Sequence, residues 1–345
     1  MKKVAIIGAT GFGGLGLIEL LHSHPQFKLN RLVARKDTGL PISKIFPHLS
    51  NFCDMTIQSM EEFDSDCDLA FLSTPDRAGM TIIDEFVKRK IRVIDFSGDF
   101  RFNNIDDYTV YAANKGMETI HHAPNALTSS VYGLPEKYAD EIKNAAIVGN
   151  PGCFAICMIL ALLPAIEANI IESDTIICDG KSGVSGAGKI SGEANLYPQR
   201  HENINTYREG KHQHLVEVEN VLKLCGANKK VFFIPQVVPM SRGILNNMYF
   251  DVKDGHAKRI QELYTEYYKD KPFVRITESS PNTSNVAGSN LCEIRVLVDE
   301  RTGKVLITSV IDNLLKGQSG NAVQNANIMM GYDERLGLQK IPFYP

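Results

Sequence analysis

The first 150 residues alternate between short apolar runs and stretches in which apolar residues recur with a helical period. The apolar runs, which we interpret as strands, cover residues 3–8, 29–34, 69–73, 93–96 and 146–149. Helical patterns lie between them, for example at residues 14–22 and 77–88. Continuous apolar strands that alternate with helices indicate a parallel sheet covered on both faces. We therefore predict a doubly wound α/β domain at the N-terminus.

From about residue 165 the pattern changes, and several runs alternate between apolar and polar residues. Strands are predicted at residues 175–179, 231–235, 247–252, 291–298 and 305–310. Helices are predicted at residues 215–224, 256–268 and 320–330. Alternation of this kind is typical of strands with one solvated face. It predicts an α+β domain with a mixed or antiparallel sheet.

The composition excludes several classes of protein. A chain of 345 residues is long for one core, so two domains are expected. A net charge of −3 offers no basic surface for nucleic acid. No apolar run reaches the roughly 18 residues of a membrane span. The apolar N-terminal stretch runs directly into glycines, unlike a signal peptide. We expect a cytoplasmic protein that acts on small molecules and binds neither nucleic acid nor membrane.

The cysteines suggest neither disulfides nor a metal site. There are seven, which is an odd number, and they are scattered without a Cys-x-x-Cys pair. A disulfide framework or a structural zinc site is therefore disfavoured, and we expect no metal ion.

A glycine-rich loop follows the first predicted strand. Gly8, Gly11 and Gly14 have the spacing G-x-x-G-x-x-G, and the helix of residues 15–21 comes next. Glycines in this position let the backbone approach a pyrophosphate that sits on the helix N-terminus. We predict a Rossmann-type dinucleotide site; the alternative is a turn needed only for helix–strand packing. The predicted cofactor-binding residues here are Gly8, Thr10, Gly11, Phe12, Gly13 and Gly14.

The end of the second strand bears on the choice of cofactor. An NAD site usually places an acidic residue there, but this chain has Arg35 and Lys36. Two cations suit the 2′-phosphate of NADP, so we predict NADP(H) as the cofactor. The alternative is that both are solvated surface charges.

Cys153 is the candidate nucleophile. It follows Asn150, Pro151 and Gly152, just where the apolar helical run of residues 154–163 begins. The partial positive charge and open N–H groups of a helix N-terminus favour a thiolate, which attacks acyl carbons. The alternative is a small buried apolar residue.

A second segment offers an acid/base for the thiol. His212 and His214 share a face if this segment is extended, and in a helix Glu217 lies three residues from His214. The alternatives are structural histidines or a His-x-His metal site, for which no third ligand is evident.

Residues 181–188 nearly match a G-x-S-x-G elbow, but Ala187 replaces the last glycine, so a serine hydrolase is disfavoured. This loop is suited to an anion or the nicotinamide end of a cofactor; the alternative is a surface turn.

Taken together, these segments resemble the N-acetyl-γ-glutamyl-phosphate reductase family in its long, non-fused form. The resemblance covers nearly the whole chain. The matching segments are residues 95–101, 131–136, 150–154, 182–188, 212–217, 238–244, 289–290 and 311–321. It implies that Cys153 attacks the acyl phosphate, that phosphate leaves, and that NADPH reduces the thioester to N-acetyl-glutamate semialdehyde in arginine biosynthesis.

The resemblance also implies domain boundaries and an assembly. The NADP-binding domain would comprise residues 1–150 with 315–345, because it includes the C-terminal helix. The catalytic and dimerisation domain would comprise residues 151–314. A homo-oligomer, dimer or tetramer, is expected.

The resemblance assigns some roles to a single residue and leaves others with more than one candidate. Cys153 is the nucleophile. His214 is the first choice as acid/base and His212 the second, and the motif does not separate them; Glu217 would orient the histidine. Substrate anions would be bound by Arg101, Asn150 and Arg242. The nicotinamide end would contact Ser182, Gly186, Gly188 and Asn313.

The chain departs from the family's pattern in a few places. Gln213 and Val216 replace Arg and Pro of the family's histidine motif, Asp76 replaces a histidine, and Ile156 a threonine. None of these changes removes a catalytic atom. Three alternatives stay open: aspartate-semialdehyde dehydrogenase, reduction of a carrier-bound aminoadipyl phosphate, and a non-catalytic NADP-binding regulator.

Overall fold

The computed structural model describes residues 1–190 and 192–343. Among them the first sheet has seven strands, all parallel, in the order β3-β2-β1-β4-β5-β7-β6. The strands are β1 (Lys2–Ile7), β2 (Phe27–Val33), β3 (Ile57–Gln58), β4 (Leu69–Leu72), β5 (Arg92–Asp95), β6 (Val131–Tyr132) and β7 (Ile147–Gly149).

Helices cover both faces of this sheet. All four residues of β4 are buried, and so are the last four of β1, as expected for strands with a helix layer on each side. The helices of this region are α1 (Phe12–Leu21), α2 (Ile42–Ile45), α3 (Gly79–Lys88), α4 (Ile105–Asn114), α5 (Pro124–Thr128), α6 (Pro135–Asn144) and α11 (Gly320–Met329). The doubly wound architecture predicted from the sequence is confirmed.

The second sheet is mixed, with the order β12-β13-β14-β11-β8-β10-β9. Its strands are β8 (Thr175–Ser182), β9 (Asn205–Thr206), β10 (Lys230–Val237), β11 (Ile244–Phe250), β12 (Val274–Ile276), β13 (Cys292–Val298) and β14 (Val305–Ile311). β8 runs parallel to β10, and β12 to β13, whereas β11, β13 and β14 pair antiparallel. This also agrees with the predicted fold class.

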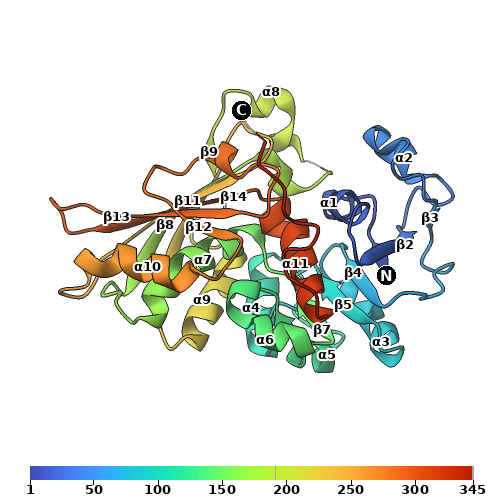
Figure 1. The fold of residues 1–345 in the computed structure, drawn as a ribbon, viewed down its shortest axis with the longest axis horizontal. Coiled ribbons are helices and arrows are strands. Elements are labelled where there is room, and N and C mark those ends of the chain that lie inside the picture. Colours follow the sequence, from blue (N-terminus) through green and yellow to red (C-terminus); the bar gives the residue numbers. More distant parts are fainter. Residues whose placement is uncertain (191, 344–345) are drawn as a thin grey trace. The chain divides into compact units, whose positions relative to one another are not determined.

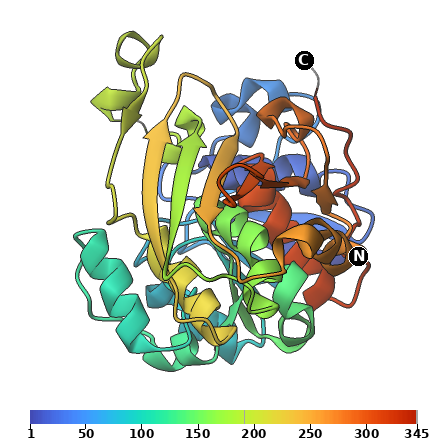
Figure 2. The same cartoon turned by 90° about the vertical axis from the view of Figure 1, so that its left-hand side faces the viewer.

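Three long helices line one face of the second sheet (Figures 1 and 2). They are α7 (Cys153–Glu167), α9 (His214–Leu224) and α10 (Ile260–Tyr268), and a short α8 (Tyr197–Arg200) follows β8. Residues 154–166 of α7 are all buried, so this apolar helix forms the centre of the second core.

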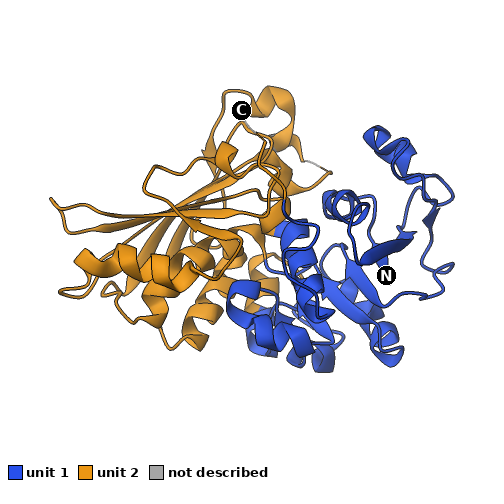
Figure 3. Ribbon diagram, viewed as in Figure 1, with its two compact units in different colours: residues 1–109, 119–151, 318–339 blue, residues 110–118, 152–317, 340–345 orange. Residues whose placement is uncertain are grey.

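The chain divides into two compact units (Figure 3). Unit 1 comprises residues 1–109, 119–151 and 318–339, and unit 2 comprises residues 110–118, 152–317 and 340–345. The last two residues, 344 and 345, lie outside the described part of the chain.

Several helix boundaries differ from those predicted. The helix expected from residue 77 begins at Gly79, because Arg77 has a left-handed backbone with φ 71°. The helix expected from residue 256 begins as a 3-10 turn at Ala257–Arg259 before α10. The helix expected to end at residue 163 continues through Pro164 to Glu167. The patterns identified the elements, whereas local backbone contacts determine where each one begins and ends.

Candidate active site

Cys153 is the first residue of α7 and is half-buried. Gly152 is the N-cap, with φ −70° and ψ 148°, and has no side chain to cap the helix. Cys153 therefore lies at the positive end of the α7 dipole. Such a position favours a thiolate over a thiol. All seven cysteines lie in the described part of the chain, and none forms a disulfide.

Two side chains from the first turn of α9 reach the residue before Cys153. The Gly152 N–H donates to Oε2 of Glu217 at 2.9 Å. Oε1 of Glu217 lies 4.0 Å from Nε2 of His214. A Cβ at position 152 would lie 2.2 Å from the same Nε2, so only glycine fits there. Unit 2 therefore brings together the thiol-bearing turn, an imidazole and a buried carboxylate.

His212 has different surroundings from His214. Its Nδ1 accepts the backbone N–H of His214 at 3.2 Å, which places it at the start of α9. Its ring is packed against the rings of Phe154, Tyr207 and Phe233, with centroids 5.7, 5.7 and 5.4 Å away.

These contacts fix the charge state of His212. Burial, assisted by the nearby His214 and Arg208, lowers the pKa of His212 to about 2. The ring is therefore neutral at physiological pH, with an unprotonated Nδ1. The structure thus distinguishes two histidines that the motif did not separate.

Gly317, which was not among the residues predicted for the site, lies against the thiol-bearing residue. A Cβ at Gly317 would lie 2.8 Å from Cβ of Cys153. The Gly317 N–H donates to the carbonyl of Asp312 at 2.9 Å, which folds the segment after β14 back toward α7. Its place in the segment of residues 311–321 was the available signal, but the contact itself depends on the tertiary fold.

Asn313 joins two loops near the end of β14. Its Oδ1 accepts the N–H of Gly243 at 2.7 Å, and its Nδ2 donates to Oγ of Ser185 at 3.0 Å. Residues 183–185 also pair by backbone hydrogen bonds with residues 240–243. Ser182, placed in a loop by the sequence analysis, is the last residue of β8, and its hydroxyl donates to the carbonyl of Gly183.

The same region contains the other predicted loop residues. Gly186 and Gly188 are exposed, and Gly188 has φ +86° with no atom within 4 Å of a Cβ placed there. Nη1 of Arg242 lies 3.5 Å from Oδ2 of the buried Asp312. About a third of the Arg242 side chain, 35%, is exposed, so the side chain is partly accessible to solvent.

In unit 1 the glycine loop has the geometry of a dinucleotide cradle. Gly8 has φ +91°, and a Cβ there would lie 2.2 Å from the carbonyl oxygen of Ser73. A Cβ at Gly14 would lie 2.6 Å from the carbonyl oxygen of Gly8. At Gly11, the N-cap of α1, the nearest atom to a Cβ would be 3.7 Å away, and no described side chain caps the helix. Two glycines thus permit close packing, and the third leaves the helix N-terminus open for a phosphate.

The loop is connected to the end of β2, where the predicted 2′-phosphate site lies. The carbonyl of Val33 accepts the N–H groups of Gly8 and Ala9, at 2.8 and 3.1 Å. Arg35 and Lys36 follow directly and are exposed. The side chains of Arg35 and Lys36 therefore lie two and three residues after the end of β2, and that end is hydrogen-bonded to the glycine loop. Thr10 in that loop and Phe12 at the start of α1 are half-buried, and Gly13 is buried.

The predicted substrate-binding residues Asn150 and Arg101 form hydrogen bonds within unit 1. Nδ2 of Asn150 donates to the carbonyl of Gln318 at 3.1 Å, and its Oδ1 accepts from Nδ2 of Asn321 at 2.8 Å and of Asn325 at 3.2 Å. Arg101 donates through Nε to the carbonyl of Asn150 at 2.9 Å. Both side chains are buried, so these contacts fix the loop that leads into residues 151–153.

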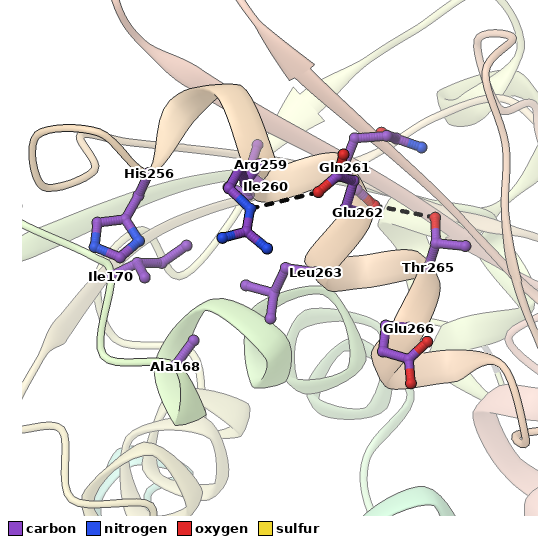
Figure 4. A pocket seen from close by; sticks show the side chains of 10 residues that line it. All are labelled: Ala168, Ile170, His256, Arg259, Ile260, Gln261, Glu262, Leu263, Thr265 and Glu266. Carbon is purple, nitrogen blue, oxygen red and sulfur yellow. Dashed lines mark hydrogen bonds and ion pairs between the residues drawn. The ribbon is translucent and has the colours of Figure 1, made fainter.

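One pocket lies on α10, well apart in sequence from the residues above (Figure 4). Charged side chains such as Arg259 and Glu262, 3.5 Å apart, line it together with a few apolar ones. None of the predicted site residues contributes to it. The described residues also contain no group of three or more His, Cys, Asp or Glu side chains arranged to hold a metal. In the described chain no helix combines the length and apolarity needed to cross a membrane.

Comparisons with known proteins agree over the whole length of the chain. Residues 3–145 match the NAD binding domain of semialdehyde dehydrogenases, and residues 153–313 match their dimerisation domain. The chain is 42% identical to the N-acetyl-gamma-glutamyl-phosphate reductase of Thermoanaerobacter sp. (strain X514), with 100% of both chains covered. The protein of that name from Bacillus cereus (strain 03BB102) is 40% identical, with 99% of each chain covered.

Solved structures share the fold at lower sequence identity. Aspartate semialdehyde dehydrogenase II from Vibrio cholerae has a TM-score of 0.71 at 20% identity, covering 96% of this chain and 99% of that one. Aspartate semialdehyde dehydrogenase with NADP from Candida albicans has a TM-score of 0.68 at 17% identity, covering 96% and 98%. At these identities the similarity supports the two-domain fold.

Proposed function

Because the chain belongs to the N-acetyl-gamma-glutamyl-phosphate reductase family, we propose that it reduces N-acetyl-γ-glutamyl phosphate to N-acetyl-glutamate 5-semialdehyde. NADPH is the reductant, inorganic phosphate is released, and the step belongs to arginine biosynthesis. One observation carries the proposal. Cys153 begins α7 directly after a glycine that contacts both His214 and Glu217.

The first step is acyl transfer to sulfur. His214 accepts the proton of the Cys153 thiol, and the thiolate attacks the acyl carbon. A carbon–sulfur bond forms, the carbon–oxygen bond to the phosphoryl group breaks, and phosphate leaves with both electrons. The positive end of the α7 dipole, where Cys153 lies, would stabilise the negative charge that develops on the acyl oxygen.

The second step releases the aldehyde. When bound, NADPH supplies the hydride that converts the thioester carbonyl to the aldehyde. Cys153 departs as the thiolate, and the imidazolium of His214 stabilises it. Glu217, buried 4.0 Å from His214, would hold the imidazole in place.

The glycine loop and β2 would hold the cofactor. The close contacts that only glycine permits at Gly8 and Gly14 let the backbone approach the pyrophosphate at the start of α1. Arg35 and Lys36 would bind the 2′-phosphate that distinguishes NADPH from NADH. At the nicotinamide end, contacts are proposed for Ser182, Gly186, Gly188 and Asn313.

Arg242 is the proposed anchor for the substrate anion. Asp312 holds one edge of its guanidinium, and the exposed edge can form paired hydrogen bonds with a carboxylate or phosphate. Asn150 and Arg101 fit a positioning role better than substrate binding, because their described hydrogen bonds are made inside unit 1. They would hold the loop that presents Cys153.

We further propose a homo-oligomer of at least two copies. The sheet face opposite α7 exposes apolar side chains, at Ile177, Phe232, Tyr249 and Leu297. A second copy would bury such a patch. The cytoplasm is the proposed location. The proposed NADP-binding domain comprises residues 1–150 with 315–345, and the catalytic domain residues 151–314.

The test follows NADP reduction with N-acetyl-glutamate semialdehyde and phosphate as substrates. The wild-type chain should turn over, and Cys153→Ser should not. The matched control is Cys157→Ser, because Cys157 is buried one turn further along α7 and contacts Oγ of Ser309 at 3.1 Å. Equal or faster turnover of aspartate semialdehyde would contradict the substrate assignment. NADP binding without turnover of any semialdehyde would favour a regulator.

A further inference from the structure

The chain passes from one unit to the other at residues 151–152 and again at residues 317–318. Within unit 1 the two passages are joined, because Nδ2 of Asn150 donates to the carbonyl of Gln318 at 3.1 Å. Within unit 2 they also touch, because a Cβ at Gly317 would lie 2.8 Å from Cβ of Cys153. Cys153 is therefore in contact with the residue from which the chain returns to unit 1.

Ser319 bonds to the glycine loop. It ends the π-helical turn of residues 315–319 and directly precedes α11, so its backbone is helical, with φ −69° and ψ −36°, and its side chain makes no capping bond. Here the hydroxyl donates instead to the carbonyl of Gly13 at 3.1 Å, inside unit 1.

Gly13 belongs to the glycine loop and has little room to move. It lies in the first turn of α1, and a Cβ there would be 2.4 Å from Oγ of Ser73. A pyrophosphate on the start of α1 would engage the N–H groups of this turn. Ser319 therefore holds the carbonyl side of the same turn whose amide side would face the cofactor.

The connection between Ser319 and Cys153 is short. Residues 315–319 form a π-helical turn, a rare geometry that is frequent at functional sites. Only Gln318 separates Ser319 from Gly317. Two peptide bonds therefore separate the residue that contacts the glycine loop from the residue that packs on Cys153.

We propose that Ser319 and Gly317 are positioning residues through which occupancy of the glycine loop sets the reactivity of the Cys153 thiol. The inference rests on the proposed function, since it takes the loop to bind NADP(H). It goes further by making the cofactor's phosphate end, and not only its nicotinamide, a determinant of thiol reactivity. The thiolate would then react faster, though not exclusively, when the reductant is already bound.

The test uses 2′-phospho-ADP-ribose, which carries the pyrophosphate and 2′-phosphate of NADP but lacks the nicotinamide ring. This probe occupies the loop without placing a ring over the thiol. The rate of alkylation of Cys153 by iodoacetamide is measured on the full chain by peptide mass spectrometry, with and without the probe. Probe affinity is measured in parallel by calorimetry.

In the wild-type chain the probe should accelerate alkylation by at least about fivefold, the lower end of typical couplings between sites. In Ser319→Ala the acceleration should disappear while the probe still binds, and Ser319→Thr, which keeps a hydroxyl, should restore it. The matched control is Ser130→Ala. Ser130 is also buried and donates to backbone carbonyls of unit 1, but it lies at neither passage. It should keep the wild-type acceleration.

Gly317→Ala tests the same connection at the residue that packs on Cys153. It replaces Ser319→Ala if that variant does not fold. Its added methyl would displace the contact with Cys153, so the acceleration should be lost without loss of probe binding. Full acceleration in the variant that folds would overturn the inference, as would a wild-type chain that binds the probe with no change in rate. A wild-type chain that does not bind the probe would overturn the cofactor assignment itself, and this inference with it.

Discussion

The backbone N–H of Gly152 donates to Oε2 of Glu217 at 2.9 Å, one residue before Cys153. This single contact joins the start of α7 to the first turn of α9. It also places a buried carboxylate 4.0 Å from the imidazole of His214. Glu217 thus has two separable functions. It accepts a hydrogen bond from the loop before Cys153, and it places a negative charge near His214.

Substitutions at Glu217 should separate these two functions. Glu217→Gln keeps an oxygen that accepts the Gly152 N–H but removes the charge. We expect kcat to fall by about tenfold, equivalent to about 1.4 kcal/mol of barrier, with KM nearly unchanged. Glu217→Ala also leaves a buried N–H without its acceptor, which should cost about 1–3 kcal/mol of stability. Steady-state kinetics and urea unfolding measure the two effects. Equal loss of stability in both variants would contradict the separation.

The two histidines should respond differently to the same substitution. His214→Asn removes the proposed acid/base and should lower kcat by about 10²- to 10⁴-fold. His212→Asn keeps an acceptor for the His214 N–H and should retain activity within about tenfold of wild type. Both variants are compared by kcat at saturating substrate. A larger loss at His212 than at His214 would reverse the assignment.

His212 also predicts how stability depends on pH. Burial, with nearby His214 and Arg208, lowers the pKa of His212 to about 2. The unfolded chain therefore binds a proton below a pH of about 6.5 that the folded chain excludes. The stabilisation is fully present above that pH. It is lost as the pH falls toward the folded value, by about 1.4 kcal/mol per pH unit.

The measurement is the free energy of urea unfolding of wild type and His212→Asn, between pH of about 7.5 and about 5. Other titrating groups contribute to both chains, so the difference between the slopes isolates His212. The wild type should lose stability faster on acidification. Parallel slopes would show that His212 becomes protonated in the folded chain.

Much of the fold could be predicted because buried parallel strands leave continuous apolar runs in the sequence. The glycine loop and Cys153 were identified because their chemistry depends on local order. The first residues of the helices were harder to predict from the sequence. The left-handed backbone of Arg77 is stabilised by Oδ1 of Asp99, which accepts its N–H at 2.8 Å from 22 positions away.

The parts of the site that were missed or left open depend on tertiary packing. His212 and His214 look alike in the motif, and only the aromatic cage around His212 separates them. Gly317 is one glycine among 27, and its contact with Cys153 spans 164 positions, from 153 to 317. In the sequence the amide of Asn150 is a candidate for substrate binding, but in the structure it bonds the backbone carbonyl of Gln318 and the side chains of Asn321 and Asn325.

The cofactor preference should depend on the cations after β2. Arg35→Ala removes a charge that would pair with the 2′-phosphate, so the preference for NADPH over NADH should fall by at least about tenfold. The ratio of kcat/KM for the two cofactors measures it. Lys28→Ala is the control, because Lys28 is an exposed cation at the opposite end of β2. If Arg35→Ala leaves the ratio unchanged, Arg35 does not bind the 2′-phosphate.

In the proposed mechanism Cys153 carries the acyl group during turnover. This is tested by mixing the protein with N-acetyl-γ-glutamyl phosphate in the absence of NADPH, quenching in acid, and locating the acyl adduct by peptide mass spectrometry. We predict one N-acetylglutamyl thioester, on Cys153, that disappears when NADPH is added before the quench. An adduct on another cysteine, or rapid phosphate release and full turnover with no adduct on Cys153, would contradict it.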